Sequence, residues 1–576
     1  MPHEHLTTPL EDLDARVKEL ERRLSALERI STVESLHQDS PGSKFAPQVL
    51  LTAIPNESQP SIFPVLGQVT LGISGAYLLR AAAESGVFPP GIIVIAALVY
   101  AAAWLVWASR SHSGGKFACY SYGITAALIL SPMLWEVTVR FRLLQPSVTA
   151  AVIAGFAALA FTLAWPRNDS HVVWPGMLSA VITALLLMPA TRALVPFTVT
   201  LLFIALLTEF AADCGRWLGF RLVSAAAADL ACLLLVLILG DSMEVPPEYY
   251  QVTPAVLIAL LTGLFAIYAL NAFVRSIVLR VRISALESTQ LAITALLAVW
   301  GVLRITHGSG GTAIGALMLL GGSLCYFAAF AYLARGTGRL NFHFYSGCGL
   351  AFILTGSFFT FPNSPLVVEL CLAAAVTTAL GVIGHSATLD LHGVVYLGAA
   401  VYASHLLEYA AGALAGTHTS SPTALVLFTA AVTLLCSAIV SRYPGERWMD
   451  RFLRLLPAIL AAYSAAALAV ATIVWLMAPG ASLAPPQLAV IRTVVTCAAA
   501  LLLVFVGSRW NRREFVWMAY GAVVLGGFKL VVEDLRLGNT RSLALSLFFY
   551  GAVLILIPRL GRVFLSASHR SRSPAP

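Results

Sequence analysis

Charged residues are scarce in this sequence. Only 11% of the 576 residues are Asp, Glu, Lys or Arg, whereas about 25% is usual in a soluble domain. Hydrophobic residues make up 59% of the chain, and the mean hydropathy is +0.83. The composition therefore excludes an ordinary soluble domain and predicts an integral membrane protein whose main partner is the lipid bilayer.

Motifs for catalysis and for metal or cofactor binding are also missing. The 8 cysteines form no C-x-x-C pair and no close cluster, so we interpret them as small apolar packing residues. There is no G-x-S-x-G serine turn. The first connection expected outside the membrane is only about "ESGVFPP", too short for the outer loops of a membrane glycosyltransferase. The sequence therefore indicates neither a metal nor a cofactor, and it favours a protein that is not an enzyme.

The apolar residues form about 18 uninterrupted runs of roughly 20 residues, which is the length of a membrane-spanning helix. The runs extend from Ile62 almost to the C-terminus and do not alternate as the strands of a membrane barrel would. We therefore predict an all-α fold, a polytopic transmembrane helical bundle at residues 62–561. A basic, disordered tail is expected at residues 562–576. One of the predicted spans covers residues 393–413.

The net charge of +8 does not indicate a nucleic-acid partner, because Lys and Arg are distributed as in a membrane protein. Basic residues gather in the connections on the N-terminal side of the predicted membrane, for example at Arg110, Arg167 and Arg280. Cytoplasmic connections carry such an excess, so both termini are predicted to be cytoplasmic. The N-terminus is a charged helix rather than a cleavable signal peptide.

Residues 1–36 predict a cytoplasmic coiled-coil helix, and residues 37–61, rich in Ser, Pro, Gln and Asn, predict a flexible linker. Within residues 8–31 the apolar positions alternate in spacing as a and d of about three heptads, which favours a homo-oligomer through a parallel coil. The alternative is a single amphipathic helix on the protein or the membrane, because so few heptads are marginal alone. The heptad residues are Leu10, Leu13, Val17, Leu20, Leu24 and Leu27.

Three ionisable residues deep in predicted spans are candidate buried polar sites, because such groups are costly in hydrocarbon and are often functional. Asp229 lies among small residues in "SAAAADLACLLLV". His405 and Glu408 share one helical face, where they predict either a proton-relay or substrate-binding pair, or a hydrogen-bonded pair that ties two helices together. The H-x-x-E pattern lacks the second Glu-x-x-His half of a di-metal bundle, so no metal is predicted.

Other acidic residues lie nearer to the ends of predicted spans. Glu209 and Asp213 are four residues apart at a cytoplasmic span end, where we expect them to meet Arg216 or Arg221. Glu369 lies near the outer start of its span, where we expect it to reach water.

A candidate rim cluster comprises charged residues from the first and the last hairpins of the membrane domain. Lys529 precedes Glu533 and Asp534 at the outer end of a span, and Arg80 precedes Glu84 in the same way. A lysine in hydrocarbon is tolerated when its ammonium reaches a carboxylate at the rim. We therefore predict a structural cluster that fixes the first hairpin against the last.

The two hairpins also carry a resemblance. Together with an N-terminal coiled coil and a linker, they resemble the bacterial multi-spanning proteins of the domain of unknown function 2339 family. That family implies an architecture and a bacterial cytoplasmic (inner) membrane location, and it implies no activity. The residues that carry the resemblance are Gly67, Gly72, Gly75, Arg80, Glu84, Gly86 and Pro89 in the first hairpin, and Lys529, Asp534, Leu535 and Arg541 in the last.

Three functional hypotheses follow from these features. The first is a transporter or a lipid- or envelope-handling protein acting on a small molecule or lipid. The second is a non-catalytic scaffold or sensor that self-associates through its coiled coil, and the third is a membrane-embedded transferase. A polar cavity joining Asp229 to His405 would favour the first hypothesis, whereas local partners for each group would favour the second.

Overall fold

The computed structural model describes residues 62–84, 89–111, 115–241, 246–334, 339–415, 421–441, 448–478, 483–509, 512–537 and 539–570. The chain divides into two units, Met1–Ser61 and Ile62–Pro576. The predicted coiled coil and linker fall in the first unit and lie outside the described residues. Within the described ranges the second unit is helical and contains no strand, so the predicted all-α fold is confirmed.

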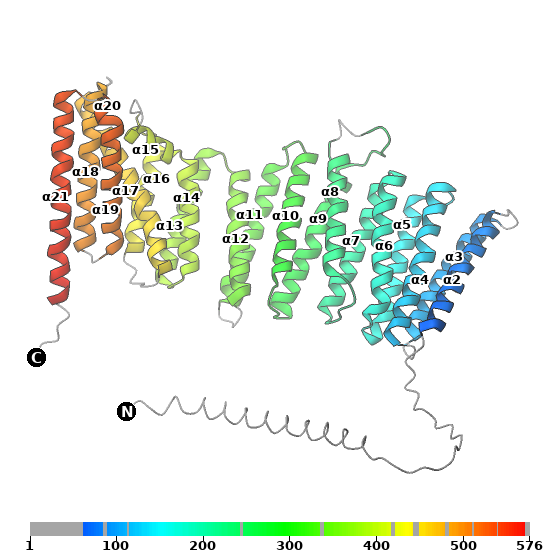
Figure 1. Cartoon of the computed structure of the whole chain (residues 1–576). Helices are drawn as coiled ribbons and strands as arrows, with labels where there is room; N and C mark the ends of the chain where they lie inside the picture. The colour runs from blue at the N-terminus through cyan, green and yellow to red at the C-terminus, as the bar shows by residue number, and fades with distance from the viewer. Residues whose placement is uncertain are drawn as a thin grey trace, which may run out of the picture. The chain divides into compact units, whose positions relative to one another are not determined.

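Figure 1 shows the helices in chain order. Their bounds are α2 (Ile62–Glu84), α3 (Pro90–Arg110), α4 (Gly115–Trp135), α5 (Pro146–Ala164), α6 (Ser170–Thr191), α7 (Leu194–Asp213), α8 (Arg221–Leu239), α9 (Pro254–Phe273), α10 (Ala285–Ile305), α11 (Gly311–Phe327), α12 (Arg339–Thr360), α13 (Asn363–Ile383), α14 (Ala387–Ala403), α15 (Leu406–Ala415), α16 (Ala424–Ser441), α17 (Trp448–Met477), α18 (Pro485–Arg509), α19 (Arg513–Lys529), α20 (Leu535–Leu537) and α21 (Thr540–Arg570). Short π-helical or 3₁₀ segments adjoin some of them: η2 (Glu136–Arg140), η3 (Trp165–Arg167), η4 (Val274–Val278), η5 (Ala328–Leu333) and η6 (Leu530–Asp534).

Sixteen helices among the described residues are long and apolar enough to cross a membrane, so the chain is an integral membrane protein. In addition, α2 is a helix of 23 residues over the first predicted span. At the other end, α21 continues to Arg570. The helix therefore extends into residues 562–576, where a basic tail is expected.

The span predicted at residues 393–413 is broken into two short helices. Between α14 and α15, Ser404 and His405 form a turn, and the φ angle of His405 is +57°, in the left-handed region. A left-handed residue cannot continue a right-handed helix. The Ser404 hydroxyl donates to the Val401 carbonyl at 3.2 Å, which satisfies one acceptor at the end of α14. The prediction of one unbroken helix over residues 393–413 is therefore wrong.

Glycines bring α11 and α12 unusually close together. A Cβ atom added to Gly356 would lie 2.8 Å from the carbonyl oxygen of Gly315, and one added to Gly322 would lie 3.0 Å from that of Gly349. In each helix the two glycines are about two turns apart on one face. Small residues at this spacing allow membrane helices to pack backbone against backbone.

The buried apolar residues form several clusters rather than one core. The largest cluster draws on α2 to α10 and includes the fully buried side chains of Ile153, Phe197 and Leu235. A smaller cluster joins α18, α19 and α21 around Ala500 and Val553. Each group of helices therefore has local packing of its own, against which polar side chains can be held.

Candidate functional site

The most extensive buried polar site links α7, α8 and α10 through Arg221. The Arg221 guanidinium lies 2.6 Å from Glu209 of α7 and 2.9 Å from Glu287 of α10. Both carboxylates are only 4% exposed. Paired hydrogen bonds from a guanidinium to carboxylates are the strongest type of ion pair in proteins. Arg221 therefore fixes three helices together.

Local sequence positions Glu287 for this contact. Ser284 caps α10, its hydroxyl accepts from the Glu287 amide at 3.3 Å, and Glu287 Oε2 accepts from the Ser284 amide at 2.9 Å. This reciprocal capping box holds the glutamate at the start of its helix. The other oxygen, Oε1, is left to face the arginines.

A second arginine and a third carboxylate complete the site. Arg275, in η4, lies 2.8 Å from Glu287 and 3.6 Å from Asp213 at the end of α7. We call Glu209, Asp213, Arg221, Arg275 and Glu287 the α7–α10 network. It contains three carboxylates and two guanidiniums. In its ionised form the network therefore carries a surplus negative charge.

The sequence-based expectation for Glu209 is confirmed for Arg221 and not for Arg216. Arg216 instead donates to the Trp165 carbonyl and lies over the Trp165 ring, 4.9 Å from its centroid. Asp213 finds Arg275, a partner that the sequence did not indicate because it is distant in the chain.

Several buried polar atoms beside the network have no hydrogen-bond partner among the described residues. Asn271 of α9 donates from Nδ2 to Glu209, but its Oδ1 atom has no partner. The same holds for Oδ1 of Asp213 and for the hydroxyl of Tyr268, one turn before Asn271. Because buried polar groups are normally satisfied, these atoms can accept or donate further hydrogen bonds beside the network.

Asp229, the first candidate of the sequence analysis, lies deeper in the same group of helices. Both of its carboxylate oxygens accept from Nε2 of Gln290, at 2.9 and 2.8 Å. Asp229 is half-buried and Gln290 is buried. Gln290 follows Glu287 by one turn on α10, so the α8–α10 interface carries polar groups from the network further into the span.

His405 and Glu408 are not buried, in contrast to the sequence-based expectation. Their side chains are 65% and 80% exposed and pair with each other at 3.1 Å. The left-handed turn at His405 starts a new helix, so the pair stays at one helix end. Asp229 bonds to α10, whereas His405 bonds within its own turn. The two candidates are therefore separate sites.

The predicted rim cluster is likewise two clusters, and this corrects its proposed role between hairpins. Arg80 pairs with Glu84 at 3.3 Å and with Glu136 of η2 at 2.9 Å. Lys529 pairs with Asp534 at 2.8 Å and lies 3.6 Å from Glu533. The reason is that α2 packs against α4, whose end continues into η2 and supplies Glu136.

We call Arg492, Lys529, Glu533 and Asp534 the C-terminal cluster. Its centre is Arg492, which was not among the candidates predicted from the sequence. It is 2% exposed, lies 2.8 Å from Glu533, and donates to the carbonyls of Ala413 and Gly412 at 2.7 and 3.2 Å. These carbonyls belong to the last turn of α15, where a cation is favourable. The available signal was an arginine inside an apolar run.

Asp534 anchors the other half of the C-terminal cluster. It accepts from Lys529 at 2.8 Å, from the Ser546 hydroxyl at 2.6 Å and from the Thr493 hydroxyl at 3.1 Å. Lys529 also donates to the Ala489 carbonyl at 2.8 Å. Arg492, Lys529, Glu533 and Asp534 thus balance in charge, unlike the α7–α10 network.

Three π-helical turns carry charged residues of these clusters. Glu136 lies in η2, Arg275 in η4, and Glu533 with Asp534 in η6. A π turn inserts one residue into a helix and redirects the side chains around it, and such turns occur frequently at functional sites. The sequence contained no signal for them.

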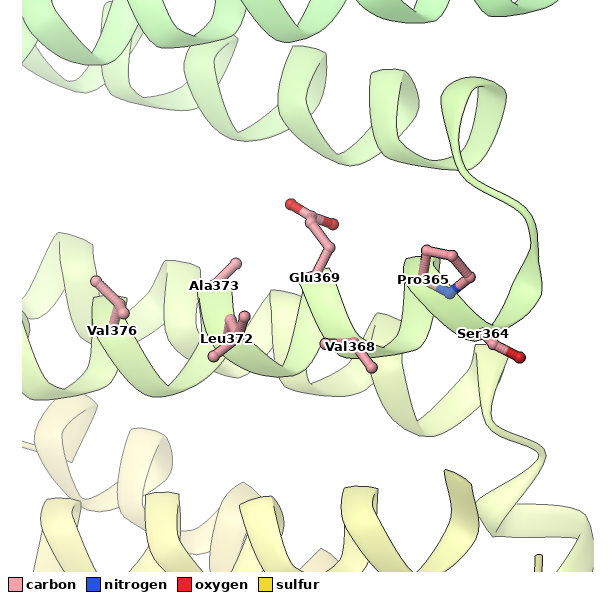
Figure 2. Close-up of a pocket in the computed structure, with 7 residues that line it drawn as sticks. All are labelled: Ser364, Pro365, Val368, Glu369, Leu372, Ala373 and Val376. Carbon is pink, nitrogen blue, oxygen red and sulfur yellow. The ribbon is translucent and has the colours of Figure 1, made fainter. Parts of the chain in front are cut away.

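A groove of about 700 Å³ follows one face of α13. Figure 2 shows Glu369 extending from this helix, with both carboxylate oxygens directed away from the α13 backbone. Glu369 does not simply reach water, because its Oε2 atom is buried; this atom has no hydrogen-bond partner in the part of the chain that the structure describes. The groove lining is otherwise apolar apart from Ser364: it comprises Ser364, Pro365, Val368, Glu369, Leu372, Ala373 and Val376.

Comparison with known proteins identifies no relative. No family model, no curated protein and no solved structure matches the chain. Among the described residues, no group of three or more His, Cys, Asp or Glu side chains is arranged to hold a metal ion. Function must therefore be inferred from the chemistry of the polar sites.

Proposed function

We propose that the protein is a transporter in which the α7–α10 network takes up and releases a proton. The observation that supports this is the surplus carboxylate: three carboxylates meet two guanidiniums at the ends of membrane-spanning helices, where Glu209 and Glu287 are only 4% exposed. An unbalanced charge is costly when it is buried away from water. Binding one proton neutralises the network, and releasing it restores the charge, so the network has two states.

The unpartnered acceptors favour a proton in particular. A carboxylate only accepts hydrogen bonds, whereas a protonated carboxyl group can also donate one. Asn271 Oδ1 is a buried acceptor that lacks a donor among the described residues, and Asp213 Oδ1 has only the long contact of 3.6 Å to Arg275. A proton on Glu209, which Asn271 contacts, supplies that donor.

Tyr268 and Asp229 extend the site towards the middle of the membrane. The Tyr268 hydroxyl is buried and has no hydrogen-bond partner within the described ranges, and Asp229 with Gln290 lies further along α8 and α10. Chains of acidic and polar groups inside spans are typical of proton relays in pumps and transporters. We therefore assign the path from Glu209 past Tyr268 to Asp229 to proton movement.

The transported molecule is a small solute or a lipid of the bacterial inner membrane. We also propose that both termini lie in the cytoplasm and that residues 8–31 join copies of the chain. Membership in the domain of unknown function 2339 family stays a proposal that rests on the two terminal hairpins.

Uptake by reconstituted protein tests the transport proposal. Proteoliposomes under an inward proton gradient are incubated with a solute and lipid extract of bacterial cells, and their contents are identified by mass spectrometry. At least one compound should accumulate, a protonophore should abolish its accumulation, and Asp213→Asn should reduce its uptake rate about tenfold or more. No difference between wild-type and protein-free liposomes would contradict the proposal.

A scaffold is the second candidate, and the C-terminal cluster favours it. There Arg492, Lys529, Glu533 and Asp534 are balanced in charge and bonded to neighbouring helices, as in a structural brace. A scaffold requires residues 8–31 for its function, and a transporter requires Asp213. Deletion of residues 1–36 and Asp213→Asn therefore separate the two candidates in cells.

A further inference from the structure

We propose that the groove on α13 binds a cationic amphiphile, a molecule with an ammonium head group and one apolar tail. The groove holds about 700 Å³ and combines an apolar ridge with one carboxylate, that of Glu369 (Figure 2). This site is separate from the α7–α10 network, so its existence does not depend on proton coupling.

Glu369 supplies the charge that would recognise the head group. Its Oε2 atom is buried and lacks a hydrogen-bond partner, and Ser357 of α12 is its polar neighbour. Ser357 is fully buried, and its hydroxyl already donates to the Ile353 carbonyl at 2.8 Å. Glu369 is the only charged residue among the described residues that line the groove, so an ammonium group lying in the groove can pair with its carboxylate through a charge-assisted hydrogen bond.

The ridge beside Glu369 supplies a surface for the tail. Val368, Leu372 and Val376 follow one another at one-turn spacing and are 40%, 57% and 54% exposed. Glu369 lies about 9 Å along the helix from the first residue of α13, and Val376 about 10 Å further. A head group at Glu369 therefore leaves the tail along the ridge, directed further along the span.

Charge selects the amphiphile over other occupants of an apolar groove. A neutral lipid tail would leave the Glu369 carboxylate unpaired, and an anionic lipid would place like charges together. A helix from a second copy of the chain could cover the ridge, but it would have to supply a cation at the depth of Glu369. An ammonium amphiphile supplies both a cation for the Glu369 carboxylate and an apolar tail for the ridge.

Binding of dodecylammonium to the purified full-length protein in a neutral detergent tests the proposal. Tryptophan fluorescence or calorimetry should give saturable binding, with no binding of dodecyl sulfate or dodecanol at the same concentrations. Glu369→Gln should weaken the affinity about tenfold or more, because it removes the charged acceptor. Glu84→Gln is the matched control, since Glu84 is an exposed carboxylate at a different site.

A second variant separates the charge from the shape of the groove. Val376→Trp fills the ridge, keeps Glu369, and should weaken binding of the twelve-carbon amine more than binding of a short amine. Val376 is exposed, so the fold tolerates this change. Equal affinity of wild-type and Glu369→Gln protein would overturn the proposal. So would self-association through α13 that depends on Glu369 and occurs without amine binding.

Discussion

At the scale of single residues, the ionisable side chains of the membrane domain are held by partners from neighbouring helices. Arg221 contacts carboxylates from α7 and α10, and Arg492 contacts Glu533 and the end of α15. Each partner reduces the cost of burying a charge, and the removal of one partner leaves the others exposed to that cost. Substitutions at these positions should therefore destabilise the protein, because they leave a buried charged group without its partner.

Replacing Arg221 with methionine should destabilise the protein strongly. The substitution leaves Glu209 and Glu287 buried beside one another with only Arg275 nearby, at a cost of about 3–5 kcal/mol. Thermal melts of protein in detergent should show the loss, and Glu209→Gln in the same chain should recover part of it. Arg216→Met should cost less, because it removes a contact to Trp165 and leaves no carboxylate unpaired. Equal melting temperatures for Arg221→Met and wild-type protein would be inconsistent with the network.

Lys529→Met should reduce the amount of folded protein in the membrane. The distances from Lys529 to the carboxylates predict which second substitutions change stability non-additively with it. Lys529 contacts Asp534, so Lys529→Met and Asp534→Asn should be non-additive in thermal melts. Glu84 pairs with Arg80 instead, so Lys529→Met and Glu84→Gln should be additive. Strong coupling between Lys529 and Glu84 would restore the single rim cluster that the sequence predicted.

At the scale of elements, the helices were predictable and their interruptions were not. Composition and run length are enough to predict the spans, because every helix that crosses a bilayer must be long and apolar. The turn at His405 occurs without glycine or proline. It depends on tertiary packing, which the sequence does not display. The π turns that place Glu136, Arg275 and Asp534 are hidden for the same reason.

Partners in the polar sites were predictable only when they were close in the chain. Glu209 and Arg221 flank one short connection, and Lys529 precedes Asp534 within one turn and a half, so sequence spacing indicated both pairs. Asn271 reaches Glu209 from a different hairpin. The extent of the α7–α10 network therefore became visible only in the folded chain.

The contact between α11 and α12 gives a prediction with an internal control. Gly356→Ala places a methyl group 2.8 Å from the Gly315 carbonyl oxygen and should separate the two helices, lowering the melting temperature. Gly347, in the same helix, has no atom within 4 Å of an added Cβ. Gly347→Ala should be neutral or stabilising by about 0.5–1 kcal/mol, because alanine favours the helix. The reverse order of stability would contradict the close packing.

At the scale of the whole molecule, the membrane domain combines a large packed core in α2–α10 with smaller clusters in the later helices. The unbalanced network belongs to the first group, and the balanced cluster of Arg492 and Asp534 to the last. This distribution supports a functional role for the first site and a structural role for the second.

The orientation of the chain is testable with reporter fusions. A reporter active outside the cytoplasm should work after Pro247 and after Ser421, and a cytoplasmic reporter after Gly115 and after Ser386. The pair at Ser386 and Ser421 flanks α14 and α15, so it shows whether the broken helix still crosses the membrane. Cytoplasmic activity at both sites would mean that α14 and α15 enter and leave on one side.

Infrared difference spectroscopy of the protein in lipid, recorded between high and low pH, tests whether the α7–α10 network takes up a proton. If the α7–α10 network binds a proton, a band from a protonated carboxyl group should appear on acidification. Glu209→Gln and Asp213→Asn should remove or shift this band, and Glu84→Gln should leave it unchanged. An identical band in wild-type, Glu209→Gln and Asp213→Asn protein would show that the α7–α10 network does not bind the proton.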